Sequence, residues 1–392
     1  MTPERAVAVL SVAAFGSSAS LRCTDALLPL LAADFGTTIG SAAAAVTAFS
    51  ISYGLLQVVH GPLGDKLGKY RLSFFTSLIS FFGTLACAFS PTLEVLVVAR
   101  FFAGATIGAL IPLAMAWIGD VIPYANRQSV LARFLIGQML GVALGASLGG
   151  YLGEHFGWRS PFYLLAVFYA VVSVMLWLEL ARNPYTRVDA AAAPTTILGG
   201  FHRMAQLLRV PWVRTILLIA AAEGAFFYGS LTFVALHLHK QLGLGLGASG
   251  TMIGAYAVGG MLYAAVSRKL VRRLGERGLA LTGGLAIGVA FLGLALSGSV
   301  ATALLCLLIV GVGIYMMHNT LQVNATQMAP ESRGAALALF ALSLFSGSSF
   351  GIWVGGKVID AYGTTPLFVM SAIAMPLLAL EFRRRLARHA TA

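Results

Sequence analysis

Arg22 and Asp25 are two ionisable residues inside the first long apolar stretch of the chain, in the sequence SLRCTDALLP (residues 20–29). A charged side chain at the centre of a lipid bilayer costs about 2.5–3.5 kcal/mol, so such residues face a polar interior or a partner. Because the two are three residues apart, they share one face of a helix and can neutralise each other. The pair therefore indicates either a static structural contact or part of a working site.

A further acid, Glu223, lies in another apolar stretch, LLIAAAEGAFFYGS (residues 217–230). Its apolar neighbours and the following glycine indicate a poorly hydrated setting. Desolvation there favours the protonated carboxyl, whereas Arg22 favours the ionised form of Asp25. One acid that binds a proton near neutral pH, beside another that stays ionised, is what a proton carrier needs. We expect Glu223 first and Asp25 second to bind protons; the alternative is a static Arg22–Asp25 pair and a backbone hydrogen bond to Glu223.

Other polar and aromatic side chains inside apolar stretches are candidate ligands for a small molecule in a central cavity. A histidine titrates close to physiological pH and suits a proton relay. The alternative for each residue is a contact between two helices, where polar side chains act as glue. The candidate substrate-binding residues are Gln57, Gln138, Phe227, Tyr228, His318, Asn319, Gln322 and Trp353.

The composition determines which elements must position these residues. Of the 392 residues, 58% are hydrophobic and only 10% are charged, and the mean hydropathy is +0.86. A soluble domain has about 25% charged residues, so the chain is expected to be an all-α integral membrane protein. The cysteines, Cys23, Cys87 and Cys306, all lie in apolar runs and indicate no disulfide framework.

A membrane-spanning helix needs about 20 residues, and the apolar stretches predict twelve such helices. The expected spans are residues 6–32, 40–63, 70–90, 93–118, 129–154, 160–181, 213–240, 248–271, 277–297, 301–326, 334–358 and 365–382.

The basic residues gather on one side of these spans. If both termini are cytoplasmic, most of the 26 Lys and Arg residues fall in cytoplasmic loops, which is the positive-inside pattern. The net charge of +12 therefore reports orientation and attraction to anionic lipids, and does not indicate a nucleic-acid partner. We expect a multi-pass protein of a bacterial inner membrane.

The longest polar interval, residues 182–212, divides the spans into two sets of six, residues 1–181 and 213–392. Its later part, FHRMAQLLRVPW, combines apolar residues at helical spacing with basic ones. This pattern is typical of a helix that lies on a membrane surface.

The two halves also repeat each other at a constant offset of 206 residues. The matched positions are Gly149–Gly150 with Gly355–Gly356, Glu154 with Asp360, and Gly157 with Gly363. Two pseudo-symmetric six-helix bundles, related as a parallel repeat, are typical of a transporter whose substrate site lies near the middle of the membrane between them.

The loop between the second and third spans, GPLGDKLGKYR (residues 61–71), resembles the signature loop of the major facilitator superfamily. Gly61, Asp65, Gly68 and Lys69 occupy the defining positions. Gly61 is expected to let two helix ends approach, and Gly68 to permit a tight turn.

The resemblance implies that this loop closes the cytoplasmic side. Asp65 is expected to face the start of the eleventh helix near Arg333, and Lys69 to pair with Asp120 at the end of the fourth. The alternative is a solvated turn.

Two further stretches resemble motifs of this family. In LVVARFFAGATIGA (residues 96–109) Arg100 occupies a position that the family associates with proton movement; the alternative is a buried structural pair. GQMLGVALGASLGG (residues 137–150) resembles the fifth-helix motif of drug and metabolite exporters, but has Gly145–Ala146 where the family has Gly-Pro. Helix packing through small residues is the alternative.

The resemblance implies a monomeric major facilitator transporter that works by alternating access. We expect a proton antiporter that exports small amphipathic or drug-like molecules; the alternative is a sugar or small-metabolite transporter, working as a uniporter or importer. The chain has no phosphate-binding loop and no histidines at metal-ligand spacing. We therefore expect no enzyme, no metal and no cofactor, with the proton gradient as the energy source.

Overall fold

The computed structural model describes residues 3–187 and 197–389. Almost all of these residues are helical, and the described ranges contain no strand. This is the all-α architecture that the composition predicts, since only helices or closed barrels satisfy backbone hydrogen bonds within lipid.

The first half of the chain runs from α1 to α10. Its elements are α1 (Pro3–Arg22), η1 (Asp25–Leu27), α2 (Leu28–Asp34), α3 (Ile39–Ala42), α4 (Ala44–Leu55), α5 (Gln57–Leu67), α6 (Lys69–Ala88), α7 (Leu93–Ile107), α8 (Leu110–Val121), α9 (Tyr124–Phe156), α10 (Ser160–Arg182) and η2 (Pro184–Arg187).

The second half follows a short helix, α11. Its elements are α11 (Ile197–Leu207), α12 (Pro211–Glu223), the π-helical turn η3 (Gly224–Tyr228), α13 (Gly229–Leu231), α14 (Val234–Leu242), α15 (Leu246–Ala295), α16 (Val300–Gln327), η4 (Pro330–Ser332), α17 (Arg333–Tyr362) and α18 (Thr364–His389).

Ten helices in the described ranges are long and apolar enough to cross a membrane, and the pair Ile39–Leu55 and Gln57–Leu67, bent by 46°, adds another. The 50-residue α15 is two helices, because Gly275 has the non-helical angles φ 62° and ψ 178°. The predicted spans 248–271 and 277–297 lie on either side of this glycine, so the structure accommodates all twelve predicted spans.

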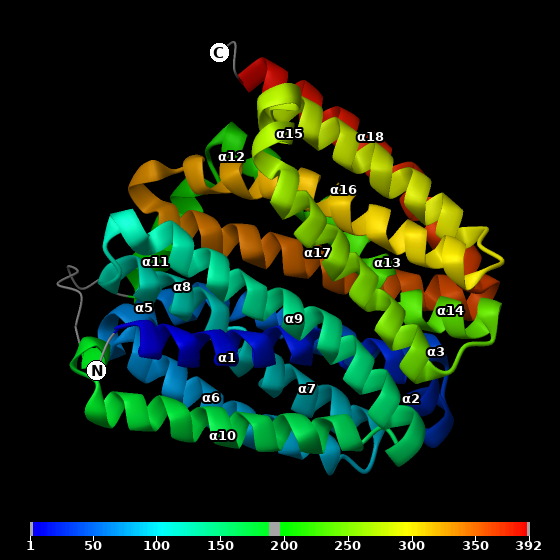
Figure 1. Cartoon of the computed structure of the whole chain (residues 1–392), viewed down its shortest axis with the longest axis horizontal. Coiled ribbons are helices and arrows are strands. Elements are labelled where there is room, and N and C mark those ends of the chain that lie inside the picture. Colours follow the sequence, from blue (N-terminus) through cyan, green and yellow to red (C-terminus); the bar gives the residue numbers. More distant parts are fainter. Residues whose placement is uncertain (1–2, 188–196, 390–392) are drawn as a thin grey trace.

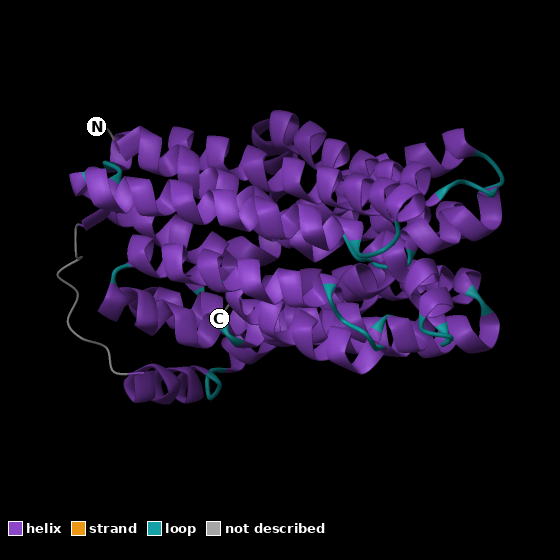
Figure 2. Cartoon of the chain, turned by 90° about the horizontal axis from the view of Figure 1, so that it is seen from below, coloured by secondary structure: helices purple, strands orange, loops and turns teal. Residues whose placement is uncertain are grey.

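The helices run side by side, and the loops gather at two ends (Figures 1 and 2). We call the end with the start of α1, Gly68 and Gly275 the linker end, and the end with residues 89–92, 243–245 and 296–299 the far end. The end of α18 also lies at the linker end, where His389 stacks on Trp212 with ring centroids 3.9 Å apart. In Figure 1, α1 to α10 fill the lower part of the molecule and α12 to α18 the upper part.

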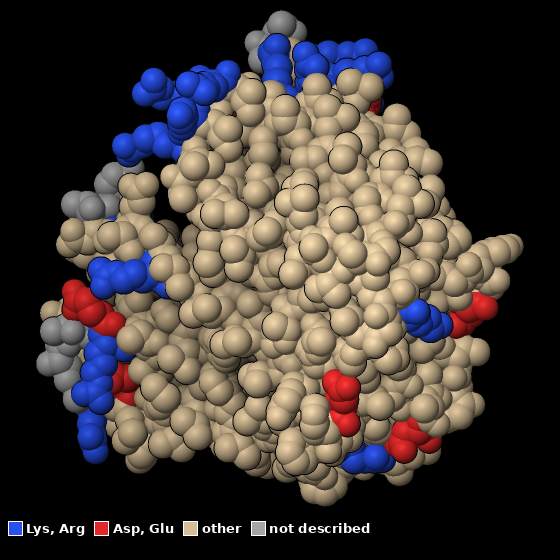
Figure 3. Space-filling view, turned by 45° about the vertical axis from the view of Figure 1, so that its right-hand side comes forward, with Lys and Arg blue, Asp and Glu red and all other residues tan. Residues whose placement is uncertain are grey.

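In Figure 3, Lys and Arg side chains gather along the top and left of the surface, a few more lie toward the right and bottom, and a wide area of other residues lies between them. Many large apolar side chains of the long helices are exposed, such as Val167 and Leu218. A broad exposed apolar band is expected where helices face lipid.

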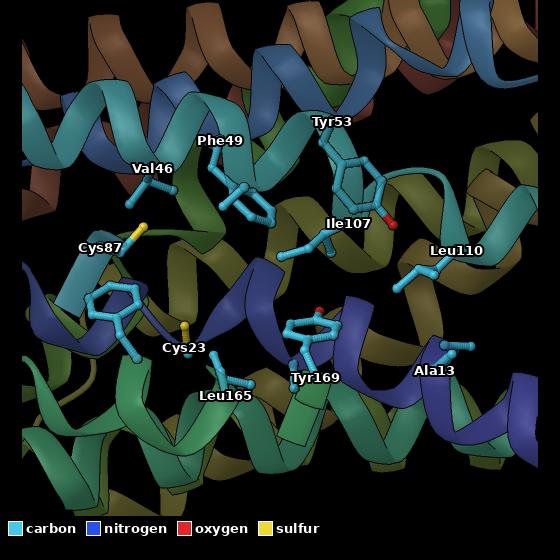
Figure 4. Packing of buried hydrophobic residues seen from close by; sticks show 14 of the residues in the cluster. Ala13, Cys23, Val46, Phe49, Tyr53, Cys87, Ile107, Leu110, Leu165 and Tyr169 are labelled. Carbon is cyan, nitrogen blue, oxygen red and sulfur yellow. The ribbon is translucent and has the colours of Figure 1, made fainter. Parts of the chain in front are cut away.

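The largest apolar core lies mainly in the first half and also takes in residues of the second, such as Phe233 and Ile352. In Figure 4, Val46, Phe49 and Tyr53 point from α4 toward Ile107 and Tyr169. Two further clusters fill the second half, and each takes in residues of the first: Ala26 and Ala146 in one, and Val58 in the other. Apolar packing therefore joins the two halves as well as filling each of them.

The predicted linker helix forms, but it lies against the protein. Met204 of α11 is buried in a cluster with Val58 of α5 and Ala336 of α17. At Gly200 an added Cβ would meet Pro62 at 3.4 Å. The apolar face of α11 therefore packs on one helix from each half, and its position on the membrane surface stays a prediction.

Candidate functional site

The first span is broken at the residues that carry charge. Helix α1 ends at Arg22, a single 3₁₀ turn follows at Asp25–Leu27, and α2 begins with Pro29 in its first turn. Proline fits this position because it lacks the N–H that the first turn leaves unpaired anyway. The break puts Asp25 at a point where the regular helix is interrupted inside the membrane-spanning region.

Arg22 and Asp25 form a buried ion pair, with Arg22 Nη1 3.1 Å from Asp25 Oδ2. The Asp25 side chain is fully buried, and its second oxygen, Oδ1, has no hydrogen-bond partner among the described residues. Buried polar atoms are nearly always paired. The unpaired Oδ1 is therefore an acceptor open to a proton or a ligand.

The seventh span also departs from a regular α-helix, but nearer to its start than the first span does. Glu223 is the last residue of α12, and the π-helical turn η3 follows at once. An added Cβ at Gly224 would collide with the carbonyl oxygen of Leu344 in α17, so only glycine allows this close contact. Short π-helical segments occur frequently at functional sites, and here the segment begins directly after the acid.

Glu223 is paired with a histidine from another helix. His318 Nδ1, from α16, lies 2.9 Å from Glu223 Oε2. The Glu223 side chain has no exposed surface, while 17% of His318 is exposed. The second carboxylate oxygen, Oε1, is buried with no partner in the described part of the chain. Both acids thus have one paired and one unpaired oxygen.

Tyr228 connects the two pairs across the seam between the halves. The Arg22 guanidinium carbon lies 5.5 Å from the centre of the Tyr228 ring, within the range of a cation–π contact. The ring of Tyr228 meets that of His318 edge-on, at 6.3 Å. Asp25, Arg22, Tyr228, His318 and Glu223 therefore form one continuous polar group, which we call the seam cluster.

Two tyrosines that the sequence analysis did not single out extend the seam cluster. Tyr256 interacts electrostatically with Tyr228 and with Tyr315. These residues come from α15 and α16, and their rings lie 6.1 Å apart. Tyrosine is common in apolar helices, so nothing in the sequence separates these two from the remaining ten.

The other candidate substrate ligands lie in different settings. Phe227 is fully buried, packed on Tyr256 and Phe291, and supports the cluster from behind. Gln57 and Gln138 are half-buried, and Gln138 Nε2 has no partner among the described residues.

Three candidates lie apart from the seam cluster. Asn319 interacts with Tyr263, and Gln322 is exposed. Trp353 is 53% exposed, and the Lys357 amine lies 4.7 Å from its ring. The structure does not bring these side chains together with Glu223, because their helices turn other faces toward it.

Arg100 is buried in the core of the first half. Its Nε donates to the carbonyl of Ala45 at 3.3 Å, and its guanidinium carbon lies 3.9 Å from the Phe49 ring centre and 5.7 Å from that of Phe162. Among the residues that the structure describes, its Nη2 has no hydrogen-bond partner and the side chain forms no ion pair. Aromatic faces therefore surround this charge, in place of the buried ion pair that was the alternative to a role in proton movement.

The loop between the second and third spans has the predicted pairing. Lys69 Nζ lies 2.7 Å from Asp120 and 2.9 Å from Asp65. Gly68 has a φ of 88°, which confirms the tight turn. Asp65 forms its ion pair with Lys69 and, in the described residues, none with Arg333, which is exposed at the start of α17. Beside Gly61 the space is open, so here no helix end approaches it.

No group of three or more His, Cys, Asp or Glu residues suited to a metal ion occurs within residues 3–187 and 197–389. The polar groups of the seam cluster are two carboxylates, an imidazole, a guanidinium and the tyrosine hydroxyls.

Residues 10–352 match the sequence profile of the Major Facilitator Superfamily. The chain is similar to YwfA, an uncharacterized MFS-type transporter of Bacillus subtilis (strain 168), with 26% identity over 360 residues, covering 90% of this chain and 85% of the relative.

Two relatives carry more specific names. The 4-hydroxybenzoate transporter PcaK of Acinetobacter baylyi is 24% identical over 366 residues, covering 85% of this chain and 80% of the relative. The multidrug export protein EmrB of Escherichia coli (strain K12) is 24% identical over 195 residues, covering 48% of this chain and 38% of the relative.

The fold is similar to that of a solved transporter. The crystal structure of a mutant of the nucleoside transporter NupG superposes with a TM-score of 0.80 at 16% identity, covering 98% of this chain and all of that chain.

Proposed function

The chain belongs to the Major Facilitator Superfamily of multi-pass membrane transporters, and on this premise we propose that it exports small amphipathic or drug-like molecules in exchange for protons. It is a secondary transporter and not an enzyme. The proposed energy source is the proton gradient, with no bound cofactor. Rocking of the two halves about the seam cluster would expose it to each side of the membrane in turn.

The observation that carries this proposal is the buried Glu223–His318 pair, directly before the break in the seventh span. Two titratable groups in contact share their protons, since the charge of one favours the opposite charge on the other. Both unpaired carboxylate oxygens, on Glu223 and Asp25, can also accept a proton or a donor of a substrate.

Exchange follows from the energetics of a buried carboxylate. An ionised acid in an apolar seam is costly unless a proton, a cation or hydrogen-bond donors compensate it. In the proposed cycle a proton and the substrate take turns in compensating Glu223, so loading one displaces the other. The aromatic rings of Phe227 and Tyr228 beside the acid suit an amphipathic substrate.

The alternative is uptake of a small metabolite. It is supported by PcaK, which aligns with 85% of this chain, whereas EmrB aligns with 48%. The buried Arg22 guanidinium facing Tyr228 suits the anionic group of such a substrate.

The test is transport in proteoliposomes with an imposed pH gradient, across a panel of cationic, neutral and anionic aromatic compounds, in both directions. Wild type is compared with Glu223→Gln and Asp25→Asn, and with Glu381→Gln as a control, because Glu381 pairs with Arg385 on the surface. We expect proton-coupled flux to be lost in Glu223→Gln and kept in the control. If both seam variants keep full coupling, the proposed proton exchange is wrong.

We further propose that the protein works as a monomer in a bacterial inner membrane, in contact with lipids, with its linker end in the cytoplasm. The basic loops around Arg272 and the basic end of α18 lie at the linker end, and basic loops favour the cytoplasmic side.

A further inference from the structure

At the far end, a carboxylate of the first half binds the start of a helix of the second. Glu154, in the last turn of α9, accepts a hydrogen bond from the backbone N–H of Gly247 at 2.7 Å. Gly247 is in the first turn of α15, where N–H groups have no partner within the helix. An anion is favoured at this position by the helix dipole.

The reverse contact is made on the other side of the seam. Asp360, near the end of α17, accepts a hydrogen bond from the backbone N–H of Gly40 at 3.0 Å. Gly40 follows the helix cap Thr38 and lies in the first turn of α3. Here the second half supplies the carboxylate and the first half the helix start.

The two contacts are equivalent by the internal repeat. Glu154 and Asp360 are the acids matched at an offset of 206 residues, and their partners Gly40 and Gly247 are matched at 207. A single acid at a helix end is common on protein surfaces. Here two acids that the repeat matches each bind, across the seam, a helix start that the repeat also matches. This symmetry indicates that the two contacts have the same role.

Both contacts require glycine in the partner segment, because a side chain there would occupy the space of the carboxylate. An added Cβ at Gly245 would collide with the Glu154 carboxylate, and one at Gly40 would collide with that of Asp360. The carbon of Gly356 lies 2.8 Å from such a Cβ on Gly40, so α3 and α17 touch backbone to backbone. Gly150 likewise packs on the carbonyl of Leu246.

We propose that Glu154 and Asp360 are paired latches that hold the far end of the transporter closed and release when it opens. This rests on the alternating access of the proposed function. Opening at the far end separates α9 from α15 and α3 from α17, so each carboxylate must exchange a charge-assisted hydrogen bond for water. Both acids are exposed, so each bond is weak enough to break in every cycle.

Asp34 supplies a matched control. It is also an exposed acid at the far end, but its partners, Trp158 and Arg159, belong to its own half, at 2.7 and 3.2 Å. Neutralising Asp34 removes the same charge from the same surface without breaking a contact across the seam.

The test measures the distance between the halves at the far end by pulsed electron spin resonance. Spin labels are attached at Pro91→Cys and Gly298→Cys, in exposed loops of different halves, after the three native cysteines are replaced. Distance distributions are recorded in lipid nanodiscs, without substrate or pH gradient, for the labelled parent, Glu154→Gln, Asp360→Asn, the double variant and Asp34→Asn.

We expect each latch variant to raise the ratio of open to closed far ends by roughly two- to fivefold, and the double variant by the product of the two. Asp34→Asn should leave the ratio unchanged. The proposal is overturned if the double variant has the parent's distribution, or if Asp34→Asn shifts it equally. Because no proton-coupled flux enters this measurement, its outcome is independent of whether Glu223 couples transport to protons.

Discussion

Glu223 and His318 form a buried pair, so the free-energy cost of burying either side chain depends on the presence of the other. Removing one member of a buried, hydrogen-bonded charged pair destabilises a protein by about 3–5 kcal/mol, because the other is left uncompensated. The pair therefore makes a prediction about stability that is separate from transport.

We predict that His318→Leu lowers the melting temperature of the detergent-solubilised protein more than Glu223→Gln does. The amide of glutamine can still meet the imidazole, whereas leucine leaves a buried carboxylate alone. In a double-mutant cycle, the coupling energy between the two positions should reach about 0.5–3 kcal/mol, the range for residues in contact. Additive effects would contradict the contact seen at 2.9 Å.

The effect of substituting Lys69 on stability depends on its two ion-pair partners. It joins Asp65 of α5 to Asp120 of α8, and its side chain is only 14% exposed. We predict that Lys69→Met destabilises the protein by about 1–3 kcal/mol. Arg385→Met, whose partner Glu381 is exposed on the same helix, should change stability by less than about 0.5 kcal/mol. Thermal unfolding of both variants, at low and high salt, checks this difference.

At the scale of elements, the breaks in the first and seventh spans, more than the lengths of these spans, determine where Asp25 and Glu223 lie. Hydropathy predicted both spans, residues 6–32 and 213–240, but as continuous helices. The break at η1 directly precedes Pro29, in the first turn of α2, so the sequence does contain a signal for it. The turn η3 coincides with the close contact of Gly224 with Leu344 of α17, and this contact is visible only in the three-dimensional packing.

Gly224 provides a test of this packing. We predict that Gly224→Ala displaces the π-helical turn from α17, destabilises the protein by about 1–3 kcal/mol and reduces transport. Gly61→Ala is the control, because an added Cβ there meets no atom within 4 Å, and it should keep the parental melting temperature. Equal effects of the two substitutions would mean that loss of glycine flexibility, not the collision, is responsible.

At the scale of the whole molecule, the sequence repeat was the most informative signal. The 206-residue offset between Glu154 and Asp360 and other matched positions indicated two like halves, and the resemblance to the major facilitator superfamily came from the loop at residues 61–71. The repeat could not reveal which residues meet across the seam. Arg22 and Tyr228 occupy equivalent positions at the 206-residue offset, but a repeat matches positions and does not say which of them touch, so their contact is visible only in the structure.

Orientation of the molecule gives a further prediction. In cells whose transporter carries Gly298→Cys in place of the native cysteines, a membrane-impermeant thiol reagent added outside should label the protein. Arg272→Cys, exposed at the opposite end, should be labelled only after the cells are opened. Labelling of Arg272→Cys in intact cells would reverse the proposed orientation.

The placement of α11 constrains how far the linker end can widen. This helix packs on α5 of the first half and on α17 of the second half at the same time, so it bridges the two halves at the linker end. When those two helices part, α11 can remain with only one of them, and the side it leaves exposes apolar surface such as Met204. The extent of opening at the linker end therefore depends on how strongly α11, which is not part of the seam cluster, packs on these two helices.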